Sequence, residues 1–541
     1  MRNRTAFVCL ALVLAAGTVI AQVDSSAPLV ASRNVAVVRT EQGSVQGFIH
    51  HGIYTYRGIP YAQASRFMPP EKPDRWEGIR TTLTYGFICP QRQGDQINDR
   101  AEFLLPHRFW PANENCQNLN VWTPGINDGK KHPVMVWFHG GGFAFGSSIA
   151  LYAYDGENLS RKGDVVVVTV NHRLNTLGFL DLSAYGSQYK NSGNVGIMDL
   201  VAALQWIKVN IANFGGDPEN VTIFGQSGGG GKVITLLATP AAKNLFQKAI
   251  VESGAARGMG MTLADPNVSR HVAEATLQNL HIEPSGLQRL KTIPYDQLND
   301  AATRAMRSVA GDNSGGMGWS PVHDGDYIPT QPFDTRAPEQ SKDIPLLIGS
   351  NLNEMSENRL SAELRDSEDW TLEQVKNYLH KKYPEKAEAL IAAYQKAYPN
   401  LKPTEWFRLD NVFRPGTVVT ANEKADQHGA SVYNYLFAWR SPVLDGSSRA
   451  PHDAEIPFAF SNIALTEQMN GGGKEAYDLS DKISRAWINF ARTGNPNHAG
   501  LPNWPAYTHE KGGTMIFDDK CEIWFDYDKE LLTLLFPDMS F

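Results

Sequence analysis

The fold of this 541-residue chain is decided by the stretch Val221-Thr222-Ile223-Phe224-Gly225-Gln226-Ser227-Gly228-Gly229. Its apolar and β-branched residues predict a buried strand, and the glycine-rich, helix-like segment after Ser227 predicts a tight turn into a helix. The residues two before and two after the serine must lack bulk in such a turn, and both are glycine. This order is the context of a nucleophile elbow, which holds a serine hydroxyl above a sheet. A Gly-x-Ser-x-Gly match alone is weak evidence in a chain with 47 glycines.

The rest of the chain alternates strand-like and helix-like segments. Near-continuous apolar runs at 134–138, 165–170, 249–251 and 345–349 predict strands that are buried on both faces, and 199–207 predicts a helix. Short β-like runs between Val35 and Phe67 predict an antiparallel edge. We therefore expect an α/β fold, a large, mostly parallel central sheet flanked by helices. The polar helical stretches 262–306 and 360–402 are interpreted as insertions over the sheet and the active site.

The amino-acid composition limits the kinds of protein that this chain can be. The chain is 42% hydrophobic and 20% charged, which is typical of a globular protein with a large core. Its formal net charge is -7 and it has no basic stripe or tail, so nucleic-acid binding is not expected. No repeat, low-complexity linker or long charge run divides the chain. We expect one domain over residues 22–541.

The N-terminus resembles a secretory signal peptide. Arg2 and Arg4 form a positive segment, residues 7–20 form an apolar segment, and a cut is predicted after Ala21. A membrane anchor is the alternative, but the apolar run is shorter than the roughly 20 residues that span a bilayer and is broken by Gly17 and Thr18. No later segment resembles a transmembrane helix. We expect a secreted or periplasmic protein without a stable membrane anchor.

Export to an oxidising compartment permits disulfides. Cys9 would leave with the signal peptide, so that Cys89, Cys116 and Cys521 remain. Cys89 and Cys116 bracket a polar loop and could form a disulfide, or both could be buried free thiols. Cys521 is interpreted as a structural residue.

Backbone donors for a developing oxyanion are predicted from a second glycine-rich motif. His139-Gly140-Gly141-Gly142-Phe143 follows directly after the strand-like run that ends at Phe138. Consecutive glycines let N–H groups converge on one point, so Gly141 and Gly142 are expected to form an oxyanion hole with the N–H of Gly228. The alternative is a loop whose glycines serve close packing only. His139 is expected to be structural.

Together these motifs and several others make the chain similar to the type B carboxylesterases, the cholinesterase-like and para-nitrobenzyl-esterase-like α/β-hydrolases. The resemblance covers nearly the whole chain after the signal. The further segments that carry it are Tyr56-Arg57-Gly58-Ile59-Pro60-Tyr61-Ala62, Glu114-Asn115-Cys116-Gln117-Asn118-Leu119-Asn120-Val121, Asn194-Val195-Gly196-Ile197-Met198-Asp199, Asn213-Phe214-Gly215-Gly216-Asp217-Pro218 and Ala491-Arg492-Thr493-Gly494-Asn495-Pro496-Asn497.

The resemblance implies a catalytic triad in the chain order serine, acid, histidine. The segment Gly349-Ser350-Asn351-Leu352-Asn353-Glu354 resembles the one that carries the acid, and nearby Glu357 is the alternative. The segment Pro451-His452-Asp453-Ala454-Glu455 resembles the one that carries the base. Ser227, Glu354 and His452 are therefore the predicted triad. His452 and Glu455 have metal-ligand spacing but no third ligand near them, so no metal is expected.

Structural features are also implied by the resemblance. The segment around Cys116 implies a Cys89–Cys116 disulfide, and the family pattern implies ion pairs Arg66–Glu114 and Arg173–Asp199.

The chain departs from the family at the elbow. The residue before the nucleophile is usually Glu and is here Gln226, and the residue after it is usually Ala and is here Gly228. Losing a negative charge beside the serine disfavours cationic substrates. Trp110 is the only tryptophan between Cys89 and Cys116, nearer the second cysteine than the family's choline-binding tryptophan. We expect neutral or anionic ester substrates, with Gln226 and Phe143 as candidate substrate contacts.

The predicted function is that of a serine carboxylesterase that forms an acyl-enzyme on small-molecule esters, with no cofactor. The alternatives on the same fold are a lipase, thioesterase, amidase or detoxifying esterase for bulky natural esters. A non-catalytic adhesion protein of the neuroligin kind is a different class. Such proteins typically lose the serine, which is present here as Ser227.

Overall fold

A 12-stranded sheet, in the order β1-β4-β5-β7-β9-β8-β10-β11-β12-β13-β14-β15, forms the centre of the protein. The computed structural model describes residues 28–92, 97–255, 262–310, 318–355 and 360–541, so the predicted signal peptide and Glu357 lie outside the described residues. The strands of the sheet are β1 (Leu29–Val30), β4 (Phe48–His50), β5 (Ile53–Pro60), β7 (Asn118–Thr123), β8 (His132–Phe138), β9 (Val166–Val170), β10 (Gly216–Gln226), β11 (Lys248–Glu252), β12 (Leu346–Asn351), β13 (Val432–Phe437), β14 (Thr514–Phe517) and β15 (Glu522–Trp524).

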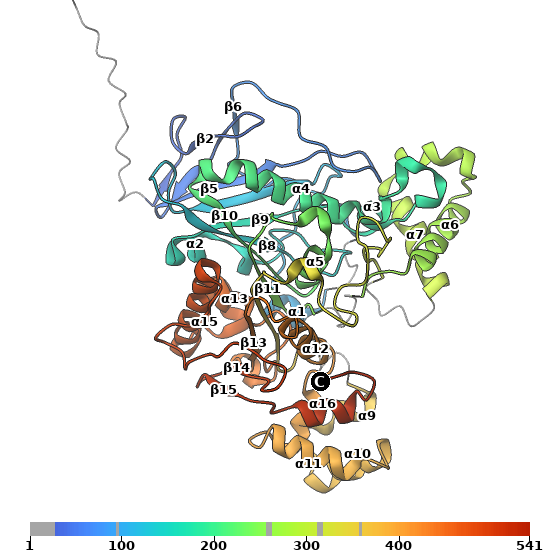
Figure 1. Cartoon of the computed structure of the whole chain (residues 1–541), viewed down its shortest axis with the longest axis vertical. Helices are drawn as coiled ribbons and strands as arrows, with labels where there is room; N and C mark the ends of the chain where they lie inside the picture. The colour runs from blue at the N-terminus through green and yellow to red at the C-terminus, as the bar shows by residue number, and fades with distance from the viewer. Residues whose placement is uncertain (1–27, 93–96, 256–261, 311–317, 356–359) are drawn as a thin grey trace, which may run out of the picture.

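The pairing within this sheet is mostly parallel. The strands from β9 through β8, β10, β11, β12 and β13 to β14 run parallel to one another. At one edge β1, β4, β5 and β7 pair antiparallel, the last of them with β9, and at the other edge β15 pairs antiparallel with β14. The parallel strands are buried along their apolar runs, as their sequences predict. The expected α/β class, with a mostly parallel sheet between helices, is confirmed (Figure 1).

Helices connect the strands and cover both faces of the sheet (Figure 1). Their bounds are α1 (Asp99–Leu104), α2 (Glu157–Gly163), α3 (Asn175–Phe179), α4 (Val195–Asn210), α5 (Gly228–Ala238), α6 (Pro266–Asn279), α7 (Tyr295–Ala310), α9 (Ala362–Arg365), α10 (Leu372–Lys382), α11 (Ala387–Ala397), α12 (Arg414–Ala425), α13 (Ile456–Ala459), α14 (Glu467–Asn470), α15 (Lys474–Thr493) and α16 (Lys529–Leu535). The two polar stretches expected to be helical insertions contain α6 with α7, and α9 to α11.

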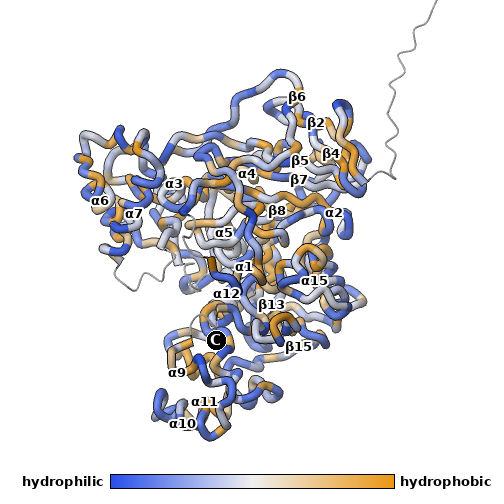
Figure 2. The backbone as a smooth tube through the Cα atoms, turned by 180° about the vertical axis from the view of Figure 1, so that it is seen from behind, coloured by the Kyte–Doolittle hydropathy of each residue, from blue (hydrophilic) through white to orange (hydrophobic). Residues whose placement is uncertain are grey.

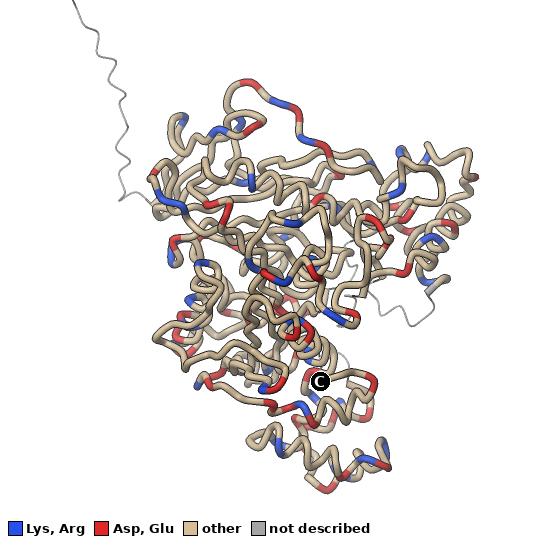
Figure 3. Tube along the Cα trace, viewed as in Figure 1, with Lys and Arg blue, Asp and Glu red and all other residues tan. Residues whose placement is uncertain are grey.

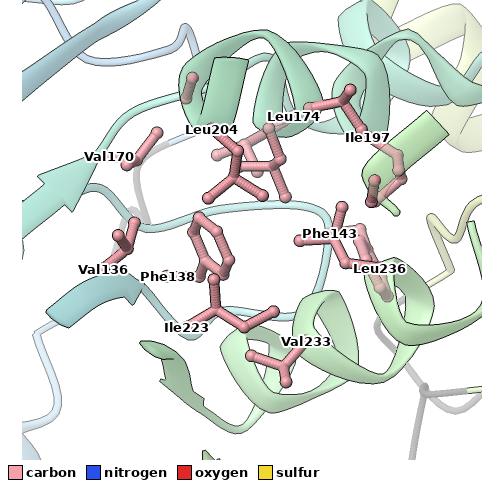
Figure 4. Packing of buried hydrophobic residues seen from close by; sticks show 14 of the residues in the cluster. Val136, Phe138, Phe143, Val170, Leu174, Ile197, Leu204, Ile223, Val233 and Leu236 are labelled. Carbon is pink, nitrogen blue, oxygen red and sulfur yellow. The ribbon is translucent and has the colours of Figure 1, made fainter. Parts of the chain in front are cut away.

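Alternate residues of each central strand enter two different hydrophobic clusters, because successive side chains of a strand point to opposite faces. On β8, Val136 and Phe138 pack against residues of α4 and α5, as Figure 4 shows for Leu204 and Val233. Met135 and Trp137 pack in the second cluster, with residues of α13 and α15. Hydrophobic segments gather on these central strands and their flanking helices, as Figure 2 shows.

Helix α4 lies within the segment Ser187–Phe214, which is long and apolar enough to cross a membrane by length and composition. In its most apolar window 67% of the residues are buried inside the protein, as in the core helix of a globular fold. Helix α4 packs in the same cluster as β8 and β10.

The expected antiparallel edge divides into two sheets. Strands β4 and β5 extend the central sheet, whereas β2 (Val37–Arg39), β3 (Ser44–Gln46) and β6 (Ile79–Thr81) form a separate three-stranded sheet. The chain passes from β3 to β4 through Gly47, where a Cβ atom would meet the Thr55 carbonyl oxygen at 2.2 Å. Strand β6 pairs parallel with β3, and this partner lies too far along the chain for a local pattern to indicate it.

Charged residues of both signs are interspersed along the backbone trace, as Figure 3 shows. One buried and one half-buried ion pair lie close to the sheet. Arg173 bonds to Asp199 with N···O distances of 2.7 and 2.8 Å, and Arg66 Nε donates to Glu114 at 2.7 Å. Both ion pairs implied by the sequence are therefore confirmed.

Candidate active site

The loops that leave the carboxyl ends of β8, β10 and β12 carry the motifs identified in the sequence. Because neighbouring parallel strands end at the same edge of a sheet, these loops converge there. The order β8-β10-β11-β12 places the His139–Gly142 loop, Ser227, Ser253 and Glu354 at successive positions along this edge. His452 reaches it from the loop that precedes α13, and its backbone N–H donates to the carbonyl oxygen of Glu354 at 3.0 Å.

Ser227 lies at the turn between β10 and α5 with φ 56° and ψ -124°. A residue with a side chain rarely adopts such a conformation, and the surrounding contacts must hold it. The Ser227 N–H donates to the Glu252 carbonyl oxygen at 2.8 Å, and its carbonyl oxygen accepts from the Gly231 N–H at 3.0 Å. A Cβ at Gly229 would lie 1.9 Å from the Phe138 carbonyl oxygen, so this turn requires glycine there.

The glycine loop after β8 closes directly onto the start of α5. Gly141 and Gly142 have φ of 83° and 60°, a region that favours glycine. A Cβ at Gly228 would meet the backbone of Gly142, with its oxygen at 2.2 Å and its Cα and nitrogen at 2.4 Å. The three glycines predicted to form the oxyanion hole are therefore adjacent in the structure.

The N–H groups of this loop are available as donors. Among the described residues, neither the Gly141 nor the Gly142 N–H takes part in a backbone–backbone hydrogen bond. Gly228 is the first residue of α5, where N–H groups have no acceptor within the helix and the helix dipole favours negative charge. The loop and the helix end together form an environment suited to an oxyanion.

Glu354 and His452 form a hydrogen-bonded pair. Glu354 Oε2 contacts His452 Nδ1, and Glu354 Oε1 accepts from the Ser253 hydroxyl at 2.6 Å and from the Asn351 N–H at 2.7 Å. The Glu354 side chain is buried. A carboxylate held by these contacts fixes the imidazole with its Nδ1 facing the acid and its Nε2 available for another partner.

Gln226 and Phe413 also touch His452. Gln226 Nε2 lies 3.3 Å from Nδ1 and 3.2 Å from Nε2 of the imidazole, so it lies over the ring. The Phe413 ring stacks on the imidazole, with centroids 4.9 Å apart and planes inclined by 16°. No hydrogen bond joins Ser227 to His452 among the described residues; such bonds often form only with substrate in place.

Carboxylates around His452 set its basicity. Burial by itself lowers the pKa of His452, but Asp453 and Glu354 favour the protonated imidazolium more strongly and raise the pKa above its usual value. Glu455 raises the pKa of His452 as well, by a smaller effect. The Glu455 Oε2 accepts from Asn351 Nδ2 at 2.6 Å.

The candidate substrate contacts are buried. Gln226 is completely buried against His452, and Phe143 is completely buried and packs edge-to-face on Phe179 with centroids 5.4 Å apart. Their contact with substrate stays a prediction.

The predicted Cys89–Cys116 disulfide is not formed in the structure, where both residues, like Cys521, are free thiols. Cys89 and Cys116 are both buried and their side chains interact, and burial raises the pKa of the Cys116 thiol. The Cys89 sulfur also accepts from the Leu174 N–H at 3.2 Å. The disulfide stays a prediction.

Several residues at the site were not found from the sequence. Ser253 and Phe413 contact the Glu354–His452 pair from other segments, and no local pattern distinguishes them. Asp453 directly follows His452 in the chain, but its effect on the charge of the imidazole was not anticipated. Lys232 could have been noticed, because it is the one charged residue in the apolar helix α5, five positions after Ser227. Its side chain is completely buried beneath the glycine loop.

Comparison with known proteins agrees with this geometry. The model of the carboxylesterase family matches residues 34–530. The para-nitrobenzyl esterase of Bacillus subtilis is 37% identical over 93% of this chain and 98% of its own length. The phenmedipham hydrolase of Pseudarthrobacter oxydans is 30% identical over 90% of this chain and 95% of its own length. The structure of an esterase from Clostridium hathewayi, described as hydrolysing aliphatic aromatic polyesters, matches 94% of this chain and 99% of its own at a TM-score of 0.84 and 40% identity. The chain belongs to the carboxylesterase family and is a carboxylic ester hydrolase with the α/β-hydrolase fold.

Proposed function

We propose that this protein is a serine carboxylesterase that hydrolyses esters through an acyl-enzyme on Ser227, with His452 as general base and acid and Glu354 as the orienting carboxylate. The observation that carries the proposal is the buried Glu354–His452 pair at the same sheet edge as the strained Ser227 turn. Serine needs both groups to act as a nucleophile at neutral pH.

The mechanism follows from these positions. His452 Nε2 takes the Ser227 proton as the serine oxygen attacks the ester carbonyl, and the resulting oxyanion accepts from the N–H groups of Gly141, Gly142 and Gly228. His452 then protonates the leaving alcohol. Water repeats the sequence, giving its proton to His452 and releasing the acid. Glu354 stabilises the imidazolium in both halves through its contact with Nδ1.

We propose neutral or anionic esters as the substrates, and not choline esters. Gln226 puts an uncharged amide where the family usually has a carboxylate, directly against His452. The names of the relatives extend the panel worth testing to para-nitrobenzyl esters, phenmedipham and an aliphatic aromatic polyester.

We also propose that residues 1–21 are removed on export and that the mature protein, residues 22–541, is one secreted or periplasmic domain. In an oxidising compartment Cys89 and Cys116 would form a disulfide. Intact mass of the exported protein, with and without reductant, tests both statements, because cleavage after Ala21 and loss of two hydrogens are separate mass changes.

A fluorophosphonate probe tests the serine assignment. It is expected to label the wild type and not Ser227→Ala, while both proteins show the same folding transition. An unlabelled but folded wild type would overturn the proposal.

Substrate class is tested separately by comparing kcat/KM for butyrylcholine with uncharged and acidic esters of similar acyl length. A wild-type preference for the choline ester would overturn the substrate proposal but leave the serine assignment intact.

A further inference from the structure

Lys232 of α5 is a completely buried lysine whose ammonium touches the glycine loop at both ends. Its Nζ donates to the carbonyl oxygen of His139 at 2.8 Å and to that of Gly142 at 2.9 Å. The Phe143 ring centroid lies 5.6 Å from the same nitrogen. Burying an ammonium group destabilises a protein unless hydrogen bonds within the protein replace those that the group makes to water. The arrangement of Lys232 therefore indicates a specific role.

Every carbonyl from residue 139 to residue 142 is held from inside the protein. Between the two bonds of Lys232, the Gly140 carbonyl contacts His139 Nδ1 at 2.8 Å, and the Gly141 carbonyl accepts from the N–H of Ala144 at 3.2 Å and of Phe145 at 3.1 Å. In a trans peptide the N–H points opposite to the C=O of the same unit. The Gly140 and Gly141 carbonyls share their peptide units with the N–H groups of Gly141 and Gly142, so the bonds to these two carbonyls set the direction of the N–H groups. The bonds of Lys232 hold the carbonyls on either side and so keep the loop in place.

Among the buried titratable groups around the glycine loop, Lys232 carries the positive charge. His139 follows β8 and His172 follows β9, and their rings stack with centroids 5.3 Å apart. Burial lowers the pKa of both histidines, and the nearby Lys232 charge lowers each further. Arg173, the next cation, is paired with Asp199. Burial lowers the pKa of Lys232 to about 7, and an oxyanion nearby would favour its charged form.

We propose that Lys232 is a positioning residue for the oxyanion hole, whose ammonium clamps both ends of the glycine loop and places a positive charge behind it. This inference rests on the proposed function. The charge acts mainly when the carbonyl oxygen becomes negative, so the clamp stabilises the transition state more than the bound ester. Gly228 fits the same arrangement, because a side chain there would push the loop away from the helix.

The test compares Lys232→Met, which removes both bonds and the charge, with Lys232→Gln, which keeps a donor but not the charge. The matched control is Lys424→Met on α12. Lys424 is also completely buried, and its Nζ donates to the carbonyls of Ser341 and Lys342. Each variant is measured for kcat, KM and inhibition by an alkyl trifluoromethyl ketone, which forms an oxyanion at the enzyme, and by the matching methyl ketone.

For Lys232→Met we expect kcat to fall about 100-fold, the scale of losing an oxyanion donor, while KM and methyl ketone affinity stay close to wild type. The affinity for the trifluoromethyl ketone should fall by the same factor as kcat. For Lys232→Gln, both quantities should lie between those of the wild type and those of Lys232→Met. Lys424→Met should lower the stability of the protein without changing kcat, KM or the affinities for the two ketones. The inference is overturned if a folded Lys232 variant keeps wild-type kcat, or if both ketones weaken equally. Activity that persists in Ser227→Ala would instead overturn the proposed function.

Discussion

His452 is surrounded by groups that act on its charge. Glu354 contacts its Nδ1, Asp453 is its neighbour in the chain, and the uncharged amide of Gln226 lies over its ring. Only the neutral imidazole can accept the serine proton, so activity is present above the pKa of His452 and is lost as the pH falls below it. The charges around the ring therefore set the acid limb of the pH–activity profile.

Asp453→Asn removes one of the two carboxylates that contribute most to raising the pKa of His452. The acid limb of kcat/KM is expected to move to lower pH by about one unit, because the imidazolium loses a stabilising charge. The profile of kcat/KM from about pH 5 to about pH 11 covers the raised pKa of His452 and measures this shift. An acid limb that stays in place, or moves to higher pH, would contradict the assignment of Asp453.

Gln226→Glu is expected to act in the opposite direction. A carboxylate at the position of the amide, within 3.3 Å of the ring nitrogens, stabilises the imidazolium and moves the acid limb to higher pH by about one unit. The same variant should gain activity on butyrylcholine relative to an uncharged ester. If neither the profile nor the substrate ratio changes, Gln226 does not act through charge.

The β10–α5 turn and the loop after β8 form one structural unit. Gly225 and Gly229 allow the turn itself, whereas Gly228 allows the loop to lie against the first turn of α5. Sequence reasoning identified these glycines because each motif is local and glycine is the residue that such backbone requires. Lys232 was not identified, since its partners His139 and Gly142 lie about ninety positions away and meet it only in the folded chain.

Gly228→Ala tests the contact between loop and helix. The new Cβ would meet Gly142 at 2.2 Å, so the loop must shift, and kcat is expected to fall by roughly 10- to 100-fold as donors leave the oxyanion. Gly286→Ala is the control, because its Cβ meets only a side-chain atom of Ile282 at 3.7 Å. In the Lys232→Met background, where the loop is no longer held, Gly228→Ala should lower kcat by a smaller factor. Additive losses would show that the two residues act independently.

At the scale of the whole molecule, one sheet joins residues from β1 near the start of the described chain to β15 near its end. The parallel core of this sheet was predictable because buried strands have continuous apolar sequences, as in Val166–Val170. The separate sheet of β2, β3 and β6 was not, because short strands with little apolar pattern do not indicate their partners. The choice of Glu354 and His452 came from family resemblance and not from spacing, since the chain has 14 histidines.

The buried Arg173–Asp199 pair ties the segment after β9 to α4, and Arg173 also donates to the carbonyls of Ser65 and Met68. Arg173→Met leaves the Asp199 charge buried without its partner, so the free energy of unfolding should fall by about 3–5 kcal/mol. Urea denaturation measures it. Lys190→Met, which breaks the exposed pair with Asp326, should change it by less than about 1 kcal/mol. Equal effects of the two substitutions would refute the account of the buried pair.

The central claim, acyl transfer through Ser227, is tested most directly by rapid mixing of the purified protein with para-nitrophenyl acetate, followed by intact mass and peptide mapping. The account predicts a burst of nitrophenolate that matches the concentration of active sites. It also predicts an acetyl group on the peptide that contains Ser227, and neither signal in Ser227→Ala. Steady hydrolysis by the wild type with no acetylated Ser227, or an equal rate in Ser227→Ala, would contradict it.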